Sequence, residues 1–223
     1  MQKIIIIGNA ISADIMHAYL KQDSRYQVVA FSVDEAYITE NNKFGLPVIA
    51  LNKLKNDYPE DNCRLIIAIG YSKLSQTRQA LFKCVKDMGY TIETFIHQDA
   101  KVYNEEGIGE GCIIMPNAVL EVYTQIGKNT VIWANCVVGH HSIVGDNCWI
   151  ASGTVLAGEV KVGKNSFIGV NVTVSNQVCV GDFNIIGSNT AIHKNTKGNE
   201  VYLSQHGVRH RFAASDYADY FLK

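Results

Sequence analysis

The chain has 223 residues, enough for one large domain or two small ones with a substantial apolar core. Its 20 lysines and arginines against 21 aspartates and glutamates give a formal net charge of −1, so nucleic acid is not expected as a partner. No apolar run is long enough for a membrane span or a signal-peptide core, which predicts a cytoplasmic protein with no membrane partner. The six cysteines include no C-x-x-C pair, so we expect free, buried thiols and no metal site.

The first 95 residues alternate β-branched runs with stretches of helical spacing. Strands are predicted at 4–7, 28–31, 65–70 and 90–95, and helices at 10–20 and 73–88. This alternation is typical of a small Rossmann-like parallel α/β domain, to which we assign residues 1–95.

A strict six-residue repeat follows. Every sixth residue from Ile96 to Ile192 is aliphatic, and the residue four places after each aliphatic is usually small or β-branched. Glycine often comes directly after the aliphatic residue, where it suits a corner of the backbone. This pattern predicts a left-handed parallel β-helix in which three hexapeptides form one triangular coil and the aliphatic residues stack inside. We assign residues 96–200 to this domain and residues 201–223 to a C-terminal tail.

The repeat resembles that of the hexapeptide acyltransferases, and the order of domains narrows the resemblance. An α/β domain before the β-helix is similar to the sugar acetyltransferases of bacterial glycan assembly. That group includes the nucleotide-4-amino-sugar N-acetyltransferases and their sialic-acid O-acetyltransferase relatives. The resemblance implies acetyl-CoA as co-substrate, a nucleotide-linked sugar as acceptor, and a homotrimer whose active sites lie between subunits.

The segment Val138 to Asp146 contains the expected catalytic base. His140 comes two residues after an inward aliphatic, so its side chain is predicted to point outward, where a neutral imidazole can accept a proton near neutral pH. The matching segment of the family has its catalytic histidine here. The family commonly has an acidic residue next, whereas this chain has His141. A further departure is Trp133, where relatives often have asparagine.

The resemblance also implies contacts to CoA. Gly158 follows His140 by one coil and is predicted to leave room for the pantetheine arm, with nearby backbone amides stabilising the oxyanion. Trp149, Val170 and Ser188 match the family's other CoA contacts, although packing between subunits is an equal alternative for Trp149. The family's terminal Gly-x-Pro-Ala-basic loop is absent. The segment 201–211 is interpreted as a polar tail, with 3′-phosphate binding as the alternative, and 213–222 as a helix that docks on a neighbour.

The first turn of the α/β domain is predicted to meet the nucleotide. It lacks the second and third glycines of a dinucleotide fingerprint, so NAD is not expected, but its amides and the following helix suit phosphates. The predicted substrate-binding residues are Gly8, Ala10, Ile11, Ser12, Asp34 and Lys73. A capping role for Asp34 and a solvated surface position for Lys73 are the alternatives.

Taken together, the sequence predicts an acetyl-CoA-dependent acetyltransferase acting on the amino group of a nucleotide-linked 4-amino-4,6-dideoxy sugar. Direct attack on the thioester is expected, with His140 as base and His141 beside it. O-acetylation of a sialic-acid-type hydroxyl is one alternative, and a non-catalytic scaffold is another. A γ-class carbonic anhydrase would need well-separated metal-binding histidines, whereas His140 and His141 are adjacent.

Overall fold

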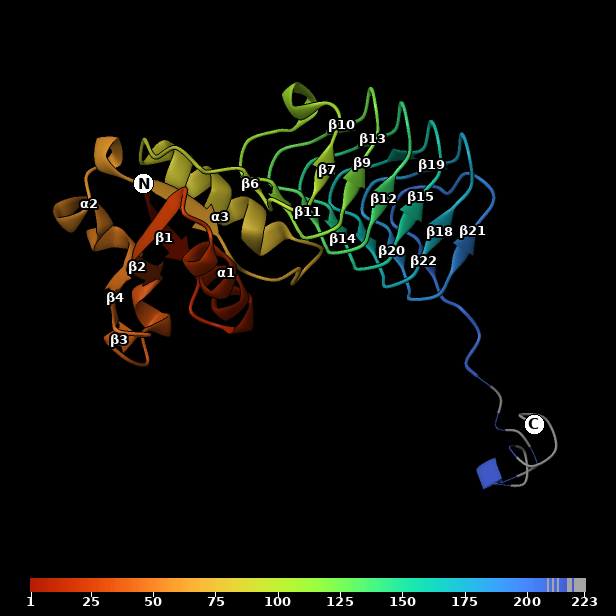
Figure 1. The fold of residues 1–223 in the computed structure, drawn as a ribbon, viewed down its shortest axis with the longest axis horizontal. Coiled ribbons are helices and arrows are strands. Elements are labelled where there is room, and N and C mark those ends of the chain that lie inside the picture. Colours follow the sequence, from red (N-terminus) through yellow and green to blue (C-terminus); the bar gives the residue numbers. More distant parts are fainter. Residues whose placement is uncertain (208, 210, 212, 216–217, 219–223) are drawn as a thin grey trace.

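The computed structural model describes residues 1–207, 209, 211, 213–215 and 218. Most of the predicted terminal helix at 213–222 lies outside these residues. The chain forms an elongated molecule with an α/β unit at one end and a stack of β-coils beside it (Figure 1). Within the described part of the chain, no helix has the length and apolarity needed to cross a membrane.

The N-terminal domain is a five-stranded sheet in the order β3-β4-β2-β1-β5. All neighbours are parallel except β3 and β4. The strands are β1 (Gln2–Ile7), β2 (Tyr26–Val33), β3 (Asn42–Lys43), β4 (Leu46–Ala50) and β5 (Arg64–Ile67), and the helices are α1 (Ile11–Gln22), α2 (Leu54–Asp57) and α3 (Gln76–Asp87). Short 3₁₀ turns lie at Glu35–Tyr37, Leu51–Lys53 and Glu60–Asn62.

Two details of this domain differ from the sequence prediction. Strand β4 was not predicted, because Pro47 interrupts its short apolar pattern; in the structure Pro47 lies on the β3 side of the strand. The predicted fourth strand at 90–95 is reduced to a single parallel bridge between Leu65 and Ile92. Its last residue already belongs to the β-helix, since Phe95 pairs with Ile113.

The C-terminal domain is a left-handed parallel β-helix of two-residue strands on three faces. The seven-stranded face contains β6 (Phe95–Ile96), β8 (Ile113–Ile114), β11 (Val131–Ile132), β14 (Trp149–Ile150), β17 (Phe167–Ile168), β20 (Ile185–Ile186) and β22 (Val201–Tyr202). The six-stranded face contains β7 (Lys101–Val102), β9 (Val119–Leu120), β12 (Val137–Val138), β15 (Val155–Leu156), β18 (Thr173–Val174) and β21 (Ala191–Ile192). The four-stranded face contains β10 (Gln125–Ile126), β13 (Ile143–Val144), β16 (Lys161–Val162) and β19 (Cys179–Val180), and a 3₁₀ turn at Glu105–Gly107 precedes it.

The predicted inward positions form the core of the β-helix. The repeated aliphatic residues line one continuous buried cluster. The small residues four places later connect the coils: Thr130 Oγ1 donates to the Gly145 carbonyl at 2.8 Å and accepts from the Cys148 N–H at 3.0 Å. The predicted tail departs from expectation at its start, because β22 pairs with β20 and Tyr202 packs against the same core.

The cysteines are free, as predicted, but not all are buried. Cys63, Cys112, Cys136 and Cys148 are buried, and burial raises the pKa of the Cys148 thiol to about 12. Cys84 is exposed on α3, and Cys179 is partly exposed because it occupies the outward position of its strand. The expectation of burial rested on the apolar character of an unpaired cysteine, which does not distinguish inward from outward positions.

The corners of the β-helix fall into two kinds, distinguished by the residue with left-handed backbone in each turn. The turns from the six-stranded to the four-stranded face, named here the His corner, have Tyr123, His141, Glu159 and Gln177 at this position. The other two sets of turns, named here the Asn corners, have mostly asparagine or glycine: Asn117, Asn135, Gly153, Asn171 and Asn189 on one side, and Gly111, Asn129, Asn147, Asn165 and Phe183 on the other.

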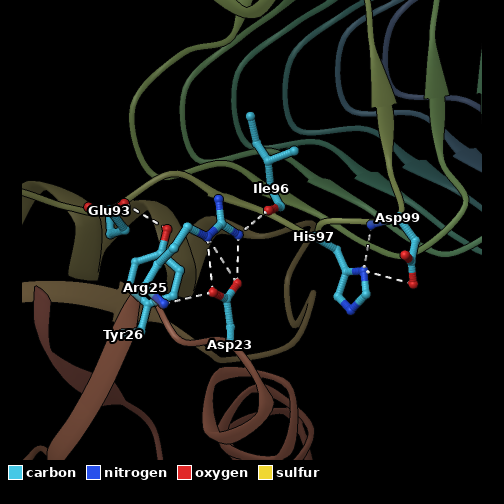
Figure 2. A network of polar contacts seen from close by, with 7 residues as sticks. All are labelled: Asp23, Arg25, Tyr26, Glu93, Ile96, His97 and Asp99. Carbon is cyan, nitrogen blue, oxygen red and sulfur yellow. Dashed lines mark hydrogen bonds and ion pairs between the residues drawn. The ribbon is translucent and has the colours of Figure 1, made fainter. Parts of the chain in front are cut away.

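Polar contacts join the two domains where the chain enters the β-helix (Figure 2). The guanidinium of Arg25 forms a fork on the Asp23 carboxylate and also donates to the carbonyl of Ile96 at 2.7 Å. These hydrogen bonds hold the pKa of Asp23 below its ordinary value. Nearby, Glu93 accepts from the Tyr26 hydroxyl at 3.0 Å and pairs with Arg64 at 2.8 Å.

A buried arginine fixes α3 against the coils. Arg78 is 1% exposed and donates to the backbone carbonyls of Ile67, Gly111 and Asn129. Desolvation lowers the pKa of Arg78 to about 10, so the side chain stays charged at neutral pH. Since its carbonyl partners come from both domains, Arg78 joins the end of β5 to the first coils of the β-helix.

Candidate functional site

His140 lies in the turn that follows β12, at the His corner. Its backbone is held on both sides: its N–H donates to Glu121 Oε2 at 2.7 Å, and its carbonyl accepts from the Glu159 N–H at 2.8 Å. The side chain is exposed, as the sequence predicts. A rigid backbone with an accessible imidazole is what a general base on a β-helix requires.

His140 and His141 contact each other through their ring nitrogens. The two Nδ1 atoms are 3.2 Å apart, and the rings meet edge to face with centroids 5.4 Å apart. His141 has a left-handed backbone with φ 57°, and its ring packs on Tyr123 with a centroid distance of 4.7 Å. The histidine pair is therefore one hydrogen-bonded unit, supported from the coil before it.

Gly158 lies directly under the imidazole of His140. A Cβ atom at this position would be 2.5 Å from His140 Nε2, so only glycine permits the observed ring position. The imidazole thus occupies the space that a side chain at position 158 would take, and room for the pantetheine arm beside it stays a prediction. The carbonyl of Gly158 accepts from Gln177, whereas its N–H makes no hydrogen bond within the described residues. An open amide beside a histidine suits an oxyanion.

Within one chain the predicted CoA contacts are separated: Gly158 lies at the His corner, and the other three residues lie elsewhere on the β-helix. Val170 and Ser188 occupy successive turns of an Asn corner, and both are exposed. Trp149, in contrast, is 7% exposed on the seven-stranded face, where it packs between Tyr71 and Trp133. Its side chain belongs to the seam between the domains of the same chain. Within one chain Trp149 therefore lies on a different side of the β-helix from Gly158, because the repeat shows that a residue points outward but not what covers it.

The predicted substrate-binding residues gather at the carboxyl end of the N-terminal sheet. Gly8 has φ 130°, and a Cβ there would be 2.6 Å from the Ala68 carbonyl, so the turn requires glycine. Helix α1 begins after Ala10 without a side-chain cap, and Ile11 is exposed. Ser12 lies half-buried in the first turn of the helix. This uncapped N-terminus leaves amide groups available to an anion.

Asp34 and Lys73 flank this turn. The carboxylate of Asp34 is exposed and accepts from the Ala36 N–H at 3.1 Å, so the capping alternative is present in the structure. Asn9 donates to the Tyr37 carbonyl at 2.9 Å and thereby joins the α1 turn to the segment after Asp34. Lys73 is exposed and is the first of three successive residues with left-handed backbone. No contact within the described residues joins this group to His140.

A small cavity lies between the two domains. It has a volume of about 20 Å³ and an almost entirely apolar lining that includes Ser12, Met16, Trp133 and Trp149. The indole N–H of Trp133 is buried without a hydrogen-bond partner in the described part of the chain. The cavity has room for about one water molecule, so it marks the domain seam rather than a sugar pocket.

Sequence reasoning missed Glu121 and Tyr123. Both belong to the coil before the histidine pair, whose strands pair at a spacing of 18 residues, as Val119 with Val137 shows. Tyr123 is 18 residues before His141, and Glu121 is 19 residues before His140. Among the described residues, no group of three or more His, Cys, Asp or Glu side chains is arranged to hold a metal ion.

Comparisons with known proteins agree with this architecture. Residues 107–140 and 123–158 match the family described as bacterial transferase hexapeptide (six repeats). No curated protein matches the chain. Among solved structures, PerB from Caulobacter crescentus in complex with CoA and GDP-perosamine is 25% identical, with a TM-score of 0.80 over 92% of this chain and 95% of that one.

Two further structures have the same fold. A mutant of perosamine N-acetyltransferase from Caulobacter crescentus is 24% identical, with a TM-score of 0.80 over 92% of this chain and 94% of that one. The acetyltransferase domain of PglB from Neisseria gonorrhoeae is 20% identical, with a TM-score of 0.78 over 92% and 97%. The predicted fold and the resemblance to hexapeptide-repeat sugar acetyltransferases are confirmed.

Proposed function

We propose that this protein is an acetyl-CoA-dependent acetyltransferase that acylates the amino group of a nucleotide-linked 4-amino-4,6-dideoxy sugar. The observation that carries the proposal is the imidazole of His140 above Gly158, whose amide N–H has no other partner in the described chain. A base and an oxyanion donor are thus neighbours. The likeness to PerB, solved with CoA and GDP-perosamine, supports the substrate class.

The chemistry assigned to these residues is direct acyl transfer. His140 Nε2 accepts a proton from the acceptor amine as the amine nitrogen attacks the thioester carbonyl. The N–H of Gly158 donates to the oxygen that becomes negative. Collapse of the tetrahedral intermediate breaks the C–S bond, and His140 returns the proton to the CoA thiolate. The products are the acetamido sugar and free CoA, with no covalent intermediate on the protein.

The other predicted residues bind rather than react. In this proposal the uncapped N-terminus of α1, with Gly8, Ala10, Ile11 and Ser12, receives the nucleotide phosphates, and Asp34 and Lys73 complete the site. Val170 and Ser188 contact CoA. The protein works as a cytoplasmic homotrimer in bacterial surface glycan biosynthesis, with each active site between two subunits.

O-acetylation of a sialic-acid-type hydroxyl is the second candidate. The observation that favours it is His141, which places an imidazole beside His140 where the resemblance leads us to expect a carboxylate. The same base and oxyanion donor serve a hydroxyl acceptor, so only the acceptor differs between the two candidates.

The test is acetyl-CoA-dependent thiol release with UDP-, dTDP- and GDP-linked 4-amino sugars and with sialic acids. Turnover of one amino sugar that is lost in His140→Ala supports the proposal. Turnover of hydroxyl acceptors alone replaces it with the second candidate. Failure to bind acetyl-CoA would favour a non-catalytic scaffold.

A further inference from the structure

A hydrogen bond joins the Nδ1 atoms of the two histidines, and one proton lies between them. Nδ1 of His140 and Nδ1 of His141 are 3.2 Å apart, and in a hydrogen bond between two neutral imidazoles one nitrogen donates while the other accepts. The direction of donation decides which nitrogen of His140 keeps a free lone pair. The groups around the two rings and the chemistry of the base determine this direction.

We propose that His141 is a positioning residue that accepts the Nδ1–H of His140 and thereby fixes His140 as the tautomer with a basic Nε2. The inference rests on the proposed function, since it concerns the base of that reaction. The reverse donation would occupy the Nδ1 lone pair of His140 and leave a proton on Nε2. His140 would then present a donor, not a base, above Gly158.

The charged groups around the pair have other hydrogen-bond partners, so the acceptor for the Nδ1–H of His140 is His141. Glu121, on the coil before, uses Oε2 to accept from the backbone N–H of His140. Glu159, on the coil after, has its carboxylate within 3.3 and 3.4 Å of the Gln177 side-chain amide. Tyr123 contacts His141 through its ring face. Among the described residues, His140 Nδ1 therefore has its hydrogen bond with His141 Nδ1.

His141 is also held in place to accept. Its N–H donates to the Val122 carbonyl at 3.1 Å, and Tyr123 packs on its ring. When His140 Nε2 takes the proton of the attacking amine, His140 carries one positive charge and its Nδ1–H bond to His141 becomes charge-assisted. Transfer of the proton to the CoA thiolate restores the neutral pair, so no proton is gained or lost over one turnover.

Three substitutions at position 141 separate this role from a structural one. His141→Gly suits the left-handed backbone but removes the acceptor. His141→Asn places a neutral oxygen, Oδ1, the same number of bonds from the backbone as Nδ1. His141→Asp places a negatively charged oxygen there. Asn117→Gly, at the left-handed position of an Asn corner, is the matched control for a change to glycine.

We expect His141→Gly to lower kcat by about 10- to 150-fold, the worth of a hydrogen bond to a charged group, while KM for acetyl-CoA stays unchanged. His141→Asn should recover most of that loss. His141→Asp should match or exceed the natural protein and move the acidic limb of the pH–rate profile to higher pH, because the carboxylate favours the protonated form of His140. Asn117→Gly should leave kcat unchanged.

Equal kcat in the natural protein and in folded His141→Gly would overturn the inference, as would equal loss in the Gly, Asn and Asp variants. The variant His140→Ala tests the proposed function independently of position 141. If His140→Ala retains activity, the base itself is misassigned. If His140→Ala is inactive while all position-141 variants turn over normally, the proposed function stands and only the role of His141 fails.

Discussion

The His corner and the Asn corners solve the same backbone problem with different residues. Every turn needs one residue with left-handed backbone, and the Asn corners mostly use asparagine or glycine, which adopt it at low cost. The His corner uses Tyr123, His141, Glu159 and Gln177 instead. For residues other than glycine and asparagine this conformation costs about 1–2 kcal/mol, so the His corner is the less stable choice.

The difference indicates where side chains matter more than the turn itself. Side chains at the His corner make contacts along the stack: Tyr123 packs on His141, and Glu159 hydrogen-bonds Gln177. Strain that persists in a repeat with an easier alternative is typical of functional positions. The predictions below test whether the His corner carries the activity and whether the Asn corners carry only the fold.

The largest effect is expected for His140→Ala. Loss of a general base lowers kcat by about 10²- to 10⁴-fold. Because the side chain is exposed, the melting temperature should change little. Thiol-release kinetics and thermal unfolding on the same sample measure both quantities. Unchanged turnover in His140→Ala would remove the reason for treating the His corner as catalytic.

The next effect is expected for Gly158→Ala. The added methyl group would be 2.5 Å from His140 Nε2 and must move the imidazole, and displacement of a reacting group by about 1 Å costs roughly 10²-fold in rate. The matched control is Gly207→Ala, the same change at a position where a Cβ atom would meet nothing within 4 Å. Steady-state kinetics should show a loss for Gly158→Ala alone; equal rates for the two variants would contradict the geometry.

Exchanging histidine and asparagine between the two kinds of corner tests whether they differ in their contribution to the free energy of unfolding. We expect His141→Asn to raise the free energy of unfolding by about 0.5–1 kcal/mol and Asn135→His to lower it by a similar amount. In a protein of this size that corresponds to about 2–4 °C in melting temperature per kcal/mol. Calorimetry on both variants measures the shifts. Shifts of the same sign would show that the two kinds of corner do not differ in backbone strain.

The smallest effect concerns acid stability, which should depend on the domain junction and not on either kind of corner. The Arg25 hydrogen bonds lower the pKa of Asp23 in the folded protein, so their contribution is present above the ordinary carboxyl range and is lost as pH falls through the lowered value. In Asp23→Asn, the loss of stability between neutral pH and about pH 3 should therefore be shallower. Denaturant titrations at several pH values measure it, with His141→Asn as the variant whose acid dependence should follow that of the natural protein.

The repeat allowed much of this molecule to be predicted, because a strict period assigns every inward residue at once. The same period identified His140 and Gly158 as neighbours on successive coils. It did not reveal what covers an outward residue, so it could not show that Trp149, which the resemblance matches to a CoA contact, packs between the two domains. Arg78 was not singled out, since a basic residue in a helix normally points to solvent. Its burial depends on three carbonyls from distant segments, which no local pattern encodes.

The stacking of the coils also makes the β-helix a molecular ruler. Each coil adds 18 residues and moves the chain along the axis by one strand spacing, about 4.8 Å. The number of coils between the domain junction at Phe95 and the turn at His140 therefore sets the distance of His140 from the N-terminal domain. Deletion or insertion of one whole coil keeps every inward aliphatic in register and changes that distance in a single fixed step. A change in the number of coils would thus fit the spacing between the two domains to a longer or shorter acceptor, with the fold of each domain unchanged.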